Sequence, residues 1–279
     1  MDIRMMAFDM DGTLRTSAGF PERNCRALQE CEKRGIKLIF CSGREVERLR
    51  EFAEIVGVDP WLASYNGSRI DRPSGGEMVE YNMYSDADAR RIYDVAKATG
   101  LPTLTFTEGK MFCTNMDACD DDGKRLRNYP SGVTTIMGKP WEVVNDDARM
   151  ETEGLHGVSK IVVCGRKFDP LFKVITDQLA DMNLSVSASS HLNIEIMCSG
   201  VDKGSAVRRI AELEGIAPEN IMAFGDHTND LPMLNYVGWP VAMGNGADEV
   251  KAAGRLIAPP AGEAGVAQII EKYVLGWED

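Results

Sequence analysis

FDMDGTL at residues 8–14 is the stretch of this 279-residue chain that decides its fold. It continues an apolar run over residues 3–8, which is typical of a buried strand in a parallel α/β sheet. Such sheets bind ligands at the carboxyl ends of their strands, where Asp9 and Asp11 lie, on one face because they are alternate residues. Gly12 then permits a sharp turn. Two carboxylates at such a turn predict a site for a hard divalent cation, although the string also fits a loop with N-cap residues.

Strand and helix patterns alternate on both sides of this motif. Before residue 82 the sequence predicts strands over residues 3–8, 36–41 and 61–65 and helices over residues 21–34 and 45–56. From residue 200 the alternation returns, with helices over residues 203–214, 231–236, 247–251 and 266–273 and strands over residues 221–224, 241–243 and 256–257. This rhythm implies a parallel sheet with right-handed crossovers, so we predict an α/β fold with a Rossmann-like core.

The middle of the chain has a different pattern. It contains strands over residues 77–84, 103–107, 110–114, 159–164, 184–188 and 193–197, and helices over residues 86–99, 140–150 and 170–182. Strands paired in sequence beside separate helices are typical of a small α+β domain. We therefore predict a discontinuous core of residues 1–81 and 191–279, interrupted by an inserted cap domain over residues 82–190.

The composition excludes several classes of partner. The formal net charge of −12 argues against nucleic acid and against docking to anionic membranes, because both need a basic surface. An anionic substrate must then be met by local positive charge. The seven cysteines contain no CxxC pair and are interpreted as reduced core residues, and the sequence shows neither a signal peptide nor a membrane span. We expect a cytoplasmic protein that is a monomer or a small homo-oligomer.

A second group of polar residues follows another predicted strand. Ser42, Gly43 and Arg44 come directly after the strand over residues 36–41 and before a predicted helix. A hydroxyl together with backbone N–H groups at a helix start binds phosphate oxygens. The alternative is that Ser42 is only the N-cap of the helix.

The sequence GDHTND at residues 225–230 forms a further group at a strand end. Its Asp226 and Asp230 would complete the carboxylate shell of a metal, and Asn229 offers an amide to a phosphate; an acidic N-cap and turn is the alternative. Lys203 begins a predicted helix, where the helix dipole disfavours a cation, so a functional role is favoured. Together these groups indicate phosphoryl transfer: one carboxylate attacks phosphorus, a second moves a proton, and a metal with one lysine neutralises the phosphate oxygens.

Taken in the order of the chain, the groups resemble motifs I to IV of the haloacid dehalogenase-like superfamily. Within that superfamily they resemble the Cof-type phosphatases, which have an inserted α/β cap. The matching stretches are FDMDGTL at residues 8–14, SGR at 42–44, KG at 203–204, GD at 225–226 with ND at 229–230, NG at 66–67 and AMGN at 242–245. There are two departures. His227 and Thr228 replace a common Gly-acid pair, and Arg15 occupies a place where a small or apolar residue is common. Both bear on specificity rather than on activity.

The resemblance implies a role for each matching residue. Asp9 would be the nucleophile that becomes phospho-aspartate, and Asp11 would protonate the leaving oxygen and then activate water. Magnesium would be held by Asp9, the main-chain carbonyl of Asp11, Asp226 and Asp230. Contacts to phosphate or substrate would come from Met10, Ser42, Gly43, Arg44, Lys203 and Asn229.

We therefore predict a Mg²⁺-dependent phosphatase, a phosphoric monoester hydrolase, for a small metabolite such as a sugar phosphate or a phosphorylated cofactor. A phosphomutase of the same superfamily is the alternative enzyme, because it uses the same Asp-x-Asp pair but passes the phosphoryl group to a second hydroxyl. A degenerate protein that only binds phosphorylated ligands is the non-enzymatic alternative, and the presence of Asp9, Asp11 and Lys203 disfavours it. The cap is expected to set substrate specificity.

Overall fold

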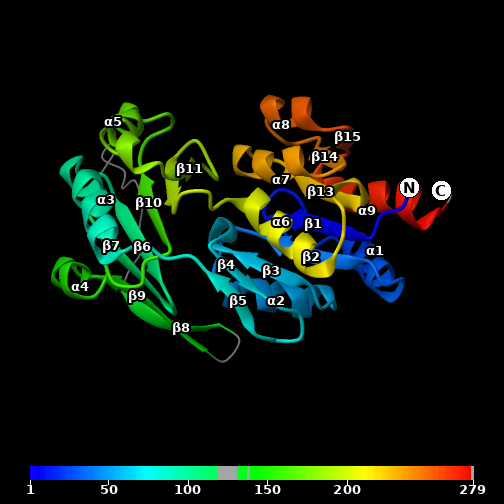
Figure 1. The fold of residues 1–279 in the computed structure, drawn as a ribbon, viewed down its shortest axis with the longest axis horizontal. Coiled ribbons are helices and arrows are strands. Elements are labelled where there is room, and N and C mark those ends of the chain that lie inside the picture. The colour runs from blue at the N-terminus through cyan, green and yellow to red at the C-terminus, as the bar shows by residue number, and fades with distance from the viewer. Residues whose placement is uncertain (118–130, 137–138, 278–279) are drawn as a thin grey trace. The chain divides into compact units, whose positions relative to one another are not determined.

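The chain divides into two compact units (Figure 1). The computed structural model describes residues 1–117, 131–136 and 139–277. The core unit consists of Met1–Glu80 and Asp202–Asp279, and the inserted unit is Tyr81–Val201. The second junction lies beyond the position expected at 190/191, because strand β12 (Asn193–Met197) pairs with strands of the inserted unit.

An eight-stranded sheet forms the centre of the core unit, in the order β15-β14-β13-β1-β2-β3-β4-β5. Its strands are β1 (Met5–Asp9), β2 (Lys37–Cys41), β3 (Trp61–Ser64), β4 (Arg69–Asp71), β5 (Met78–Tyr81), β13 (Ile221–Gly225), β14 (Trp239–Met243) and β15 (Leu256–Ala258). From β15 to β3 neighbouring strands run parallel, and β4 is antiparallel to β3. The predicted α/β core is confirmed, although the short strand β4 was not predicted.

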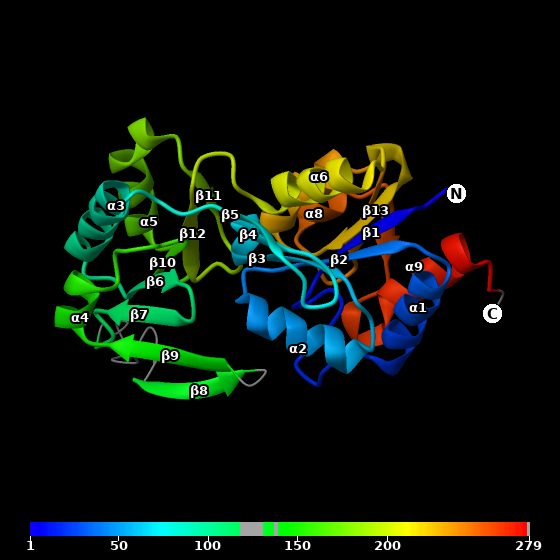
Figure 2. The same cartoon turned by 60° about the horizontal axis from the view of Figure 1, so that its bottom comes forward.

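Helices cover both faces of this sheet (Figure 2). One face carries α1 (Glu22–Lys33), α2 (Val46–Val56) and α9 (Gly265–Ile270), and the other carries α6 (Lys203–Glu214), α7 (Leu231–Tyr236) and α8 (Asp248–Ala253). Because side chains alternate along a strand, Phe8 packs in the first layer and Ala7 in the second. Asp9 has the parity of Ala7, so its carboxylate lies on the face that α6 covers.

The inserted unit is built on a seven-stranded sheet in the order β11-β12-β10-β6-β7-β9-β8. Its other strands are β6 (Thr103–Thr107), β7 (Lys110–Thr114), β8 (Gly132–Ile136), β9 (Lys139–Asn145), β10 (Lys160–Cys164) and β11 (Ser185–Ser187). Its helices are α3 (Asp86–Ala98), α4 (Asp147–Thr152) and α5 (Pro170–Gln178). Sequential strands with separate helices make it the α+β domain that the pattern predicted.

The helix predicted over residues 140–150 is wrong. Strand β9 occupies most of this stretch and pairs in parallel with β7 and antiparallel with β8. Trp141, Val143 and Val144 are residue types that favour strands. The helix begins only after Asp146, whose side chain accepts a 3.0 Å hydrogen bond from the backbone N–H of Arg149 and caps α4.

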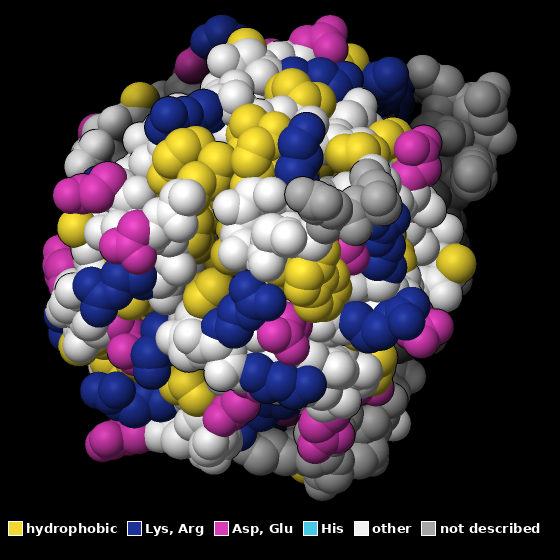
Figure 3. Space-filling model, turned by 90° about the vertical axis from the view of Figure 1, so that its right-hand side faces the viewer, with side chains coloured by type: hydrophobic (Ala, Val, Ile, Leu, Met, Phe, Trp, Pro, Cys, Tyr) yellow, Lys and Arg dark blue, Asp and Glu magenta, His cyan; other side chains and the backbone are white. Residues whose placement is uncertain are grey.

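The six cysteines within the described residues are free thiols, and Cys119 lies outside those residues. Within the described part of the chain, no helix has the length and apolar character that crossing a bilayer requires. On the side of the molecule that Figure 3 shows, basic and acidic side chains are intermixed with hydrophobic ones.

Candidate active site

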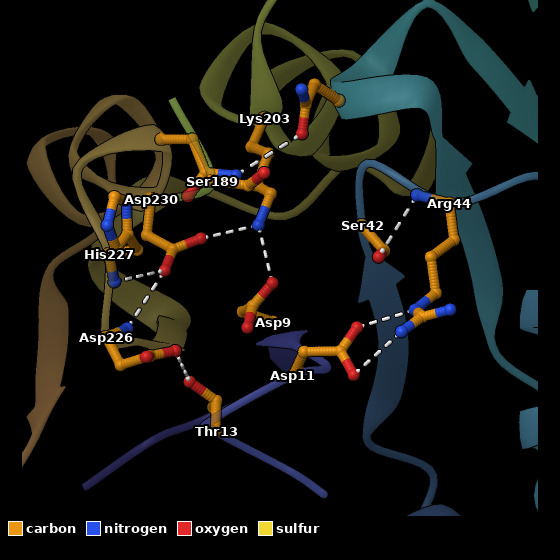
Figure 4. A network of polar contacts seen from close by, with 12 residues as sticks. Asp9, Asp11, Thr13, Ser42, Arg44, Ser189, Lys203, Asp226, His227 and Asp230 are labelled. Carbon is orange, nitrogen blue, oxygen red and sulfur yellow. Dashed lines mark hydrogen bonds and ion pairs between the residues drawn. The ribbon is translucent and has the colours of Figure 1, made fainter. Parts of the chain in front are cut away.

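A buried lysine joins two carboxylates at the carboxyl end of β1 (Figure 4). The Oδ1 atom of Asp9, the last residue of β1, accepts a 2.6 Å hydrogen bond from Nζ of Lys203, the first residue of α6. The same ammonium group donates to Oδ1 of Asp230 at 2.6 Å. Lys203 is 1% exposed and Asp230 is 0% exposed, so water barely reaches these ion pairs. The structure thus brings together three of the residues that the motifs singled out.

Asp230 also fixes the turn that carries Asp226. Its Oδ2 atom accepts hydrogen bonds from the backbone N–H groups of Asp226, at 2.9 Å, and His227, at 3.0 Å. This close approach requires glycine at position 225, because a Cβ atom there would lie 2.5 Å from Cβ of Asp230. Asp226 then accepts a 2.8 Å hydrogen bond on Oδ1 from Oγ1 of Thr13. Its carboxylate is therefore oriented from both segments of the core unit.

Gly12 allows the turn after β1 to approach Asp226. Its φ of +91° is unfavourable for other residues, and a Cβ atom there would lie 2.5 Å from Oδ2 of Asp226. Asn245 holds the turn in place: its Nδ2 donates to the Gly12 carbonyl at 2.8 Å, and its Oδ1 accepts from the N–H of Ala261 at 2.8 Å. The DxDGT string therefore forms a turn beside Asp226 rather than the N-cap of a helix, since no helix begins within it.

The buried cluster contains more negative than positive charge. Asp9, Asp226 and Asp230 offer oxygens within 4.8 Å of one another. Burial raises the pKa of Asp9 well above its ordinary value. The positive charge of Lys203 opposes this rise, and the negative charges of Asp230 and Asp226 add to it. Burial and the charge of Asp230 likewise raise the pKa of Asp226. Burial alone would lower the pKa of Lys203, but the charges of Asp230 and Asp9 outweigh it and raise that pKa, so the lysine stays protonated.

This set of donors fits a hard divalent cation. Mg²⁺ prefers oxygen ligands and keeps several waters, and the cluster presents carboxylate oxygens that are already grouped and hydrogen-bonded. Three carboxylates against one ammonium leave a formal charge of −2, which a divalent ion would balance. The residues present are therefore compatible with the predicted metal.

Asp11 is paired with two arginines. Nε of Arg44 donates to its Oδ2 at 2.6 Å and Nη2 of Arg44 to its Oδ1 at 3.1 Å, and Nη1 of Arg15 also donates to Oδ1. Figure 4 shows the Asp11 carboxylate pointing toward Arg44. Burial raises the pKa of Asp11, but the hydrogen bonds and charges of Arg44 and Arg15 outweigh it and hold that pKa below its ordinary value. Sequence reasoning did not foresee this pairing, although it noted Arg15 as unusual.

The predicted phosphate-binding residues lie in adjacent loops of the core unit. Ser42 is buried, and its Oγ accepts a 3.3 Å hydrogen bond from the N–H of Arg44. The helix that follows begins at Val46 with Glu45 as its N-cap, so the interpretation of Ser42 as that N-cap is wrong. Nδ2 of Asn229 donates to Oδ1 of Asn66 at 3.4 Å.

Met10 and Gly43, two of the predicted phosphate contacts, can reach the site only through their backbone atoms. The side chain of Met10 packs in the hydrophobic layer of α1 and α2, so only its backbone is available to the site. Gly43 is half-buried between Ser42 and Arg44. Sequence reasoning gave no role to Thr13 or Asn245, which orient Asp226 and Gly12. Both residues lie inside stretches that resemble the family motifs, FDMDGTL and AMGN, and this position was the sequence signal that could have identified them.

Comparisons with known proteins identify the family of the chain. The sequence model of the haloacid dehalogenase-like hydrolase family matches residues 6–270. The chain is 27% identical to the 5-amino-6-(5-phospho-D-ribitylamino)uracil phosphatase YcsE of Bacillus subtilis, over 99% of this chain and 97% of the relative. It is 27% identical to the HMP-PP phosphatase of Cronobacter sakazakii, over 89% of this chain and 87% of the relative. A solved haloacid dehalogenase-like hydrolase from B. subtilis has a TM-score of 0.81 at 20% identity, covering 98% of this chain and 100% of that one.

Proposed function

The chain belongs to the haloacid dehalogenase-like hydrolases, and from that membership we propose that it is a Mg²⁺-dependent phosphatase that works through a phospho-aspartate on Asp9. The observation that carries the proposal is the buried pairing of Lys203 with Asp9 and Asp230 at the carboxyl end of β1. A carboxylate held at 2.6 Å from a protonated lysine, beside further acidic groups, is suited to attack a phosphoryl group whose oxygens need neutralising.

The proposed reaction has two steps. In the first, a carboxylate oxygen of Asp9 forms a bond to phosphorus while the ester P–O bond breaks. Asp11, which must first leave Arg44 and Arg15 and take up a proton from solvent, gives that proton to the departing oxygen. In the second, Asp11 takes a proton from water, the water oxygen bonds to phosphorus, and the bond between Asp9 and phosphorus breaks. Inorganic phosphate leaves and both aspartates return to their starting states.

The surrounding residues would stabilise the phosphoryl group in both steps. Lys203 stays protonated and lies 2.6 Å from Oδ1 of Asp9, so it neutralises charge that develops there. Ser42, Asn229 and the backbone of Met10 and Gly43 would contact the other oxygens. Asp9, Asp226, Asp230 and the main-chain carbonyl of Asp11 would hold Mg²⁺, which when bound supplies charge neutralisation to the phosphoryl oxygens.

The substrate is proposed to be a small phosphorylated metabolite. The named relatives are phosphatases of a phosphoribitylamino-uracil and of HMP-PP, both small phosphorylated molecules. The negative charge of the chain, −12, is consistent with local rather than global attraction of such an anion. We also place the protein in the cytoplasm, in keeping with its free cysteines.

Replacing the nucleophile tests the proposal. Asp9→Asn keeps the size of the side chain and removes the attacking carboxylate, so we expect phosphate release from p-nitrophenyl phosphate with Mg²⁺ to fall by at least about 10³-fold. The matched control is Asp248→Asn, which makes the same chemical change at a fully exposed side chain and is expected to leave the rate unaltered. Undiminished phosphate release by Asp9→Asn would refute the proposal. With a sugar phosphate as the substrate in place of p-nitrophenyl phosphate, formation of an isomerised sugar phosphate instead of free phosphate would identify a phosphomutase.

A further inference from the structure

Two guanidinium groups of the core unit converge on one carboxylate. Arg44 donates to both oxygens of Asp11, and Arg15 donates to Oδ1 of Asp11 from the next turn of the chain. The proposed reaction needs this same carboxyl group at the leaving oxygen of the substrate. Asp11 must therefore exchange its arginine partners for the substrate during turnover.

A single aromatic ring holds both arginines in place. The Cζ atoms of Arg15 and Arg44 lie 5.1 Å and 5.7 Å from the ring centroid of Phe52 on α2. Phe52 is 5% exposed. The ring of Phe20 packs against it in a T-shaped arrangement, with 5.3 Å between the two ring centroids. The face of an aromatic ring attracts cations, so the two guanidinium groups are positioned by the fold as well as by Asp11. They would stay adjacent when Asp11 turns away.

A purely structural ion pair is the simpler interpretation, and two observations disfavour it. Arg15 reaches Asp11 through Nη1 only, and its Nε is buried with no hydrogen-bond partner among the described residues. The side chains of Arg15, Arg44 and Asp11 are 23%, 39% and 44% exposed, and ion pairs so open to water add little to stability.

The charge balance changes when Asp11 acts. Without its carboxylate, the two guanidinium groups on Phe52 repel one another and have lost the carboxylate that they share. An anionic group from the substrate would take the place of Asp11, because carboxylate and phosphate both match the N–H fork of arginine. A substrate without such a group would leave the two guanidinium groups without a shared anionic partner.

We infer that Arg15 and Arg44 form a second anion-binding site, and that the preferred substrates are phosphate monoesters with another anionic group, a carboxylate or phosphate, close to the ester oxygen. This inference rests on the proposed phosphatase function and on the role of Asp11 in it. Arg15 is then a specificity-determining residue, and Asp11 occupies the site until the substrate arrives.

A matched pair of esters tests the inference with the full-length protein and Mg²⁺. 3-Phosphoglycerate and glycerol 3-phosphate differ only by a carboxylate in place of a hydroxymethyl group. The wild-type protein is expected to favour 3-phosphoglycerate by about tenfold or more in kcat/KM, as one charge-assisted hydrogen bond allows. Arg15→Leu, which still packs on Phe52, should reduce this ratio to near one. Arg15→Lys keeps the charge without the fork and should give an intermediate ratio.

A control and a third substrate separate the possible outcomes. Arg4→Leu removes the same charge at an exposed position before β1, at the opposite edge of the sheet, and should leave the ratio as in the wild type. A wild-type ratio near one, or an equal loss for both esters in Arg15→Leu and Arg15→Lys, overturns the inference while hydrolysis of p-nitrophenyl phosphate leaves the proposed function standing. If p-nitrophenyl phosphate is not hydrolysed either, the proposed function fails and the inference fails with it.

Discussion

Replacing Lys203 by methionine is expected to destabilise the protein strongly, because methionine fills a similar volume but leaves two buried carboxylates without their cation. Nζ of Lys203 lies 2.6 Å from Oδ1 of both Asp9 and Asp230, and the lysine is 1% exposed. Removing one partner of a buried ion pair costs about 3–5 kcal/mol. For a domain of roughly 150–250 residues this corresponds to a fall of roughly 6–20 °C in Tm.

The stability lost in Lys203→Met is expected to depend on pH. Burial and the neighbouring carboxylates already raise the pKa of Asp9 well above its ordinary value, and losing Lys203 raises it further. A carboxyl group whose pKa is raised in the folded state takes up a proton, as pH falls, before the unfolded chain does. The loss of stability is therefore largest at neutral and alkaline pH, and it shrinks as pH falls through the raised pKa of Asp9.

Thermal unfolding followed by circular dichroism between pH 5 and pH 8 measures the effect. The matched control is Lys37→Met, since Lys37 is half exposed and meets Glu214 at 3.5 Å, and its cost should stay within about 1 kcal/mol. The double variant Lys203→Met with Asp9→Asn should lose less than the sum of the single losses, because the asparagine needs no counter-ion. A Lys203→Met protein as stable as the wild type at pH 7.5, or a deficit that does not shrink on acidification, would contradict the reasoning.

Two further predictions concern the carboxylates around the cluster. Thr13→Val removes the 2.8 Å hydrogen bond to Oδ1 of Asp226 while the side-chain volume stays nearly constant. We expect about 10–100-fold weaker Mg²⁺ binding in a calorimetric titration. Unchanged affinity would show that Thr13 does not orient Asp226 for the metal. Saturating Mg²⁺ at about 100 times its Kd should stabilise the wild type by about 2.7 kcal/mol at pH 7.5. Because the pKa values of Asp9 and Asp226 are raised, protons compete with the metal as pH falls, so this stabilisation should shrink toward pH 5, and a pH-independent gain would count against these ligands.

Local signals in the sequence predicted most elements of the core unit. Helix α6 begins at Lys203 and ends at Glu214 as predicted, because the side chain of Asp202 caps its start and Gly215, with φ of +63°, ends it. Strand β4 was missed because it has only three residues, and the helix over residues 140–150 was wrong because tertiary pairing of β9 decides that segment. Pairing between distant strands leaves little trace in a local pattern.

The candidate site was predictable as far as sheet geometry carries it. Asp9 ends β1 and Asp226 directly follows β13, its parallel neighbour, so the proximity of the two residues follows from the strand order. The partners of Asp11 were not predictable, because the direction of its carboxylate depends on where Phe52 of α2 holds Arg15 and Arg44. The roles of individual residues in catalysis stay predictions until the variants above are measured.

The position of β1 between β2 and β13 bears on when a newly made chain acquires its active centre. The ribosome produces Asp9 before the inserted unit, Tyr81–Val201, whereas Lys203 and Asp226 emerge only after that whole unit has been translated. The inserted unit is continuous in sequence, whereas the host sheet is completed only by strands β13, β14 and β15, which follow that unit in the chain. A nascent chain or a fragment that stops before α6 therefore contains Asp9 but lacks Lys203, Asp226 and Asp230, and the buried cluster cannot form until translation has passed Asp230.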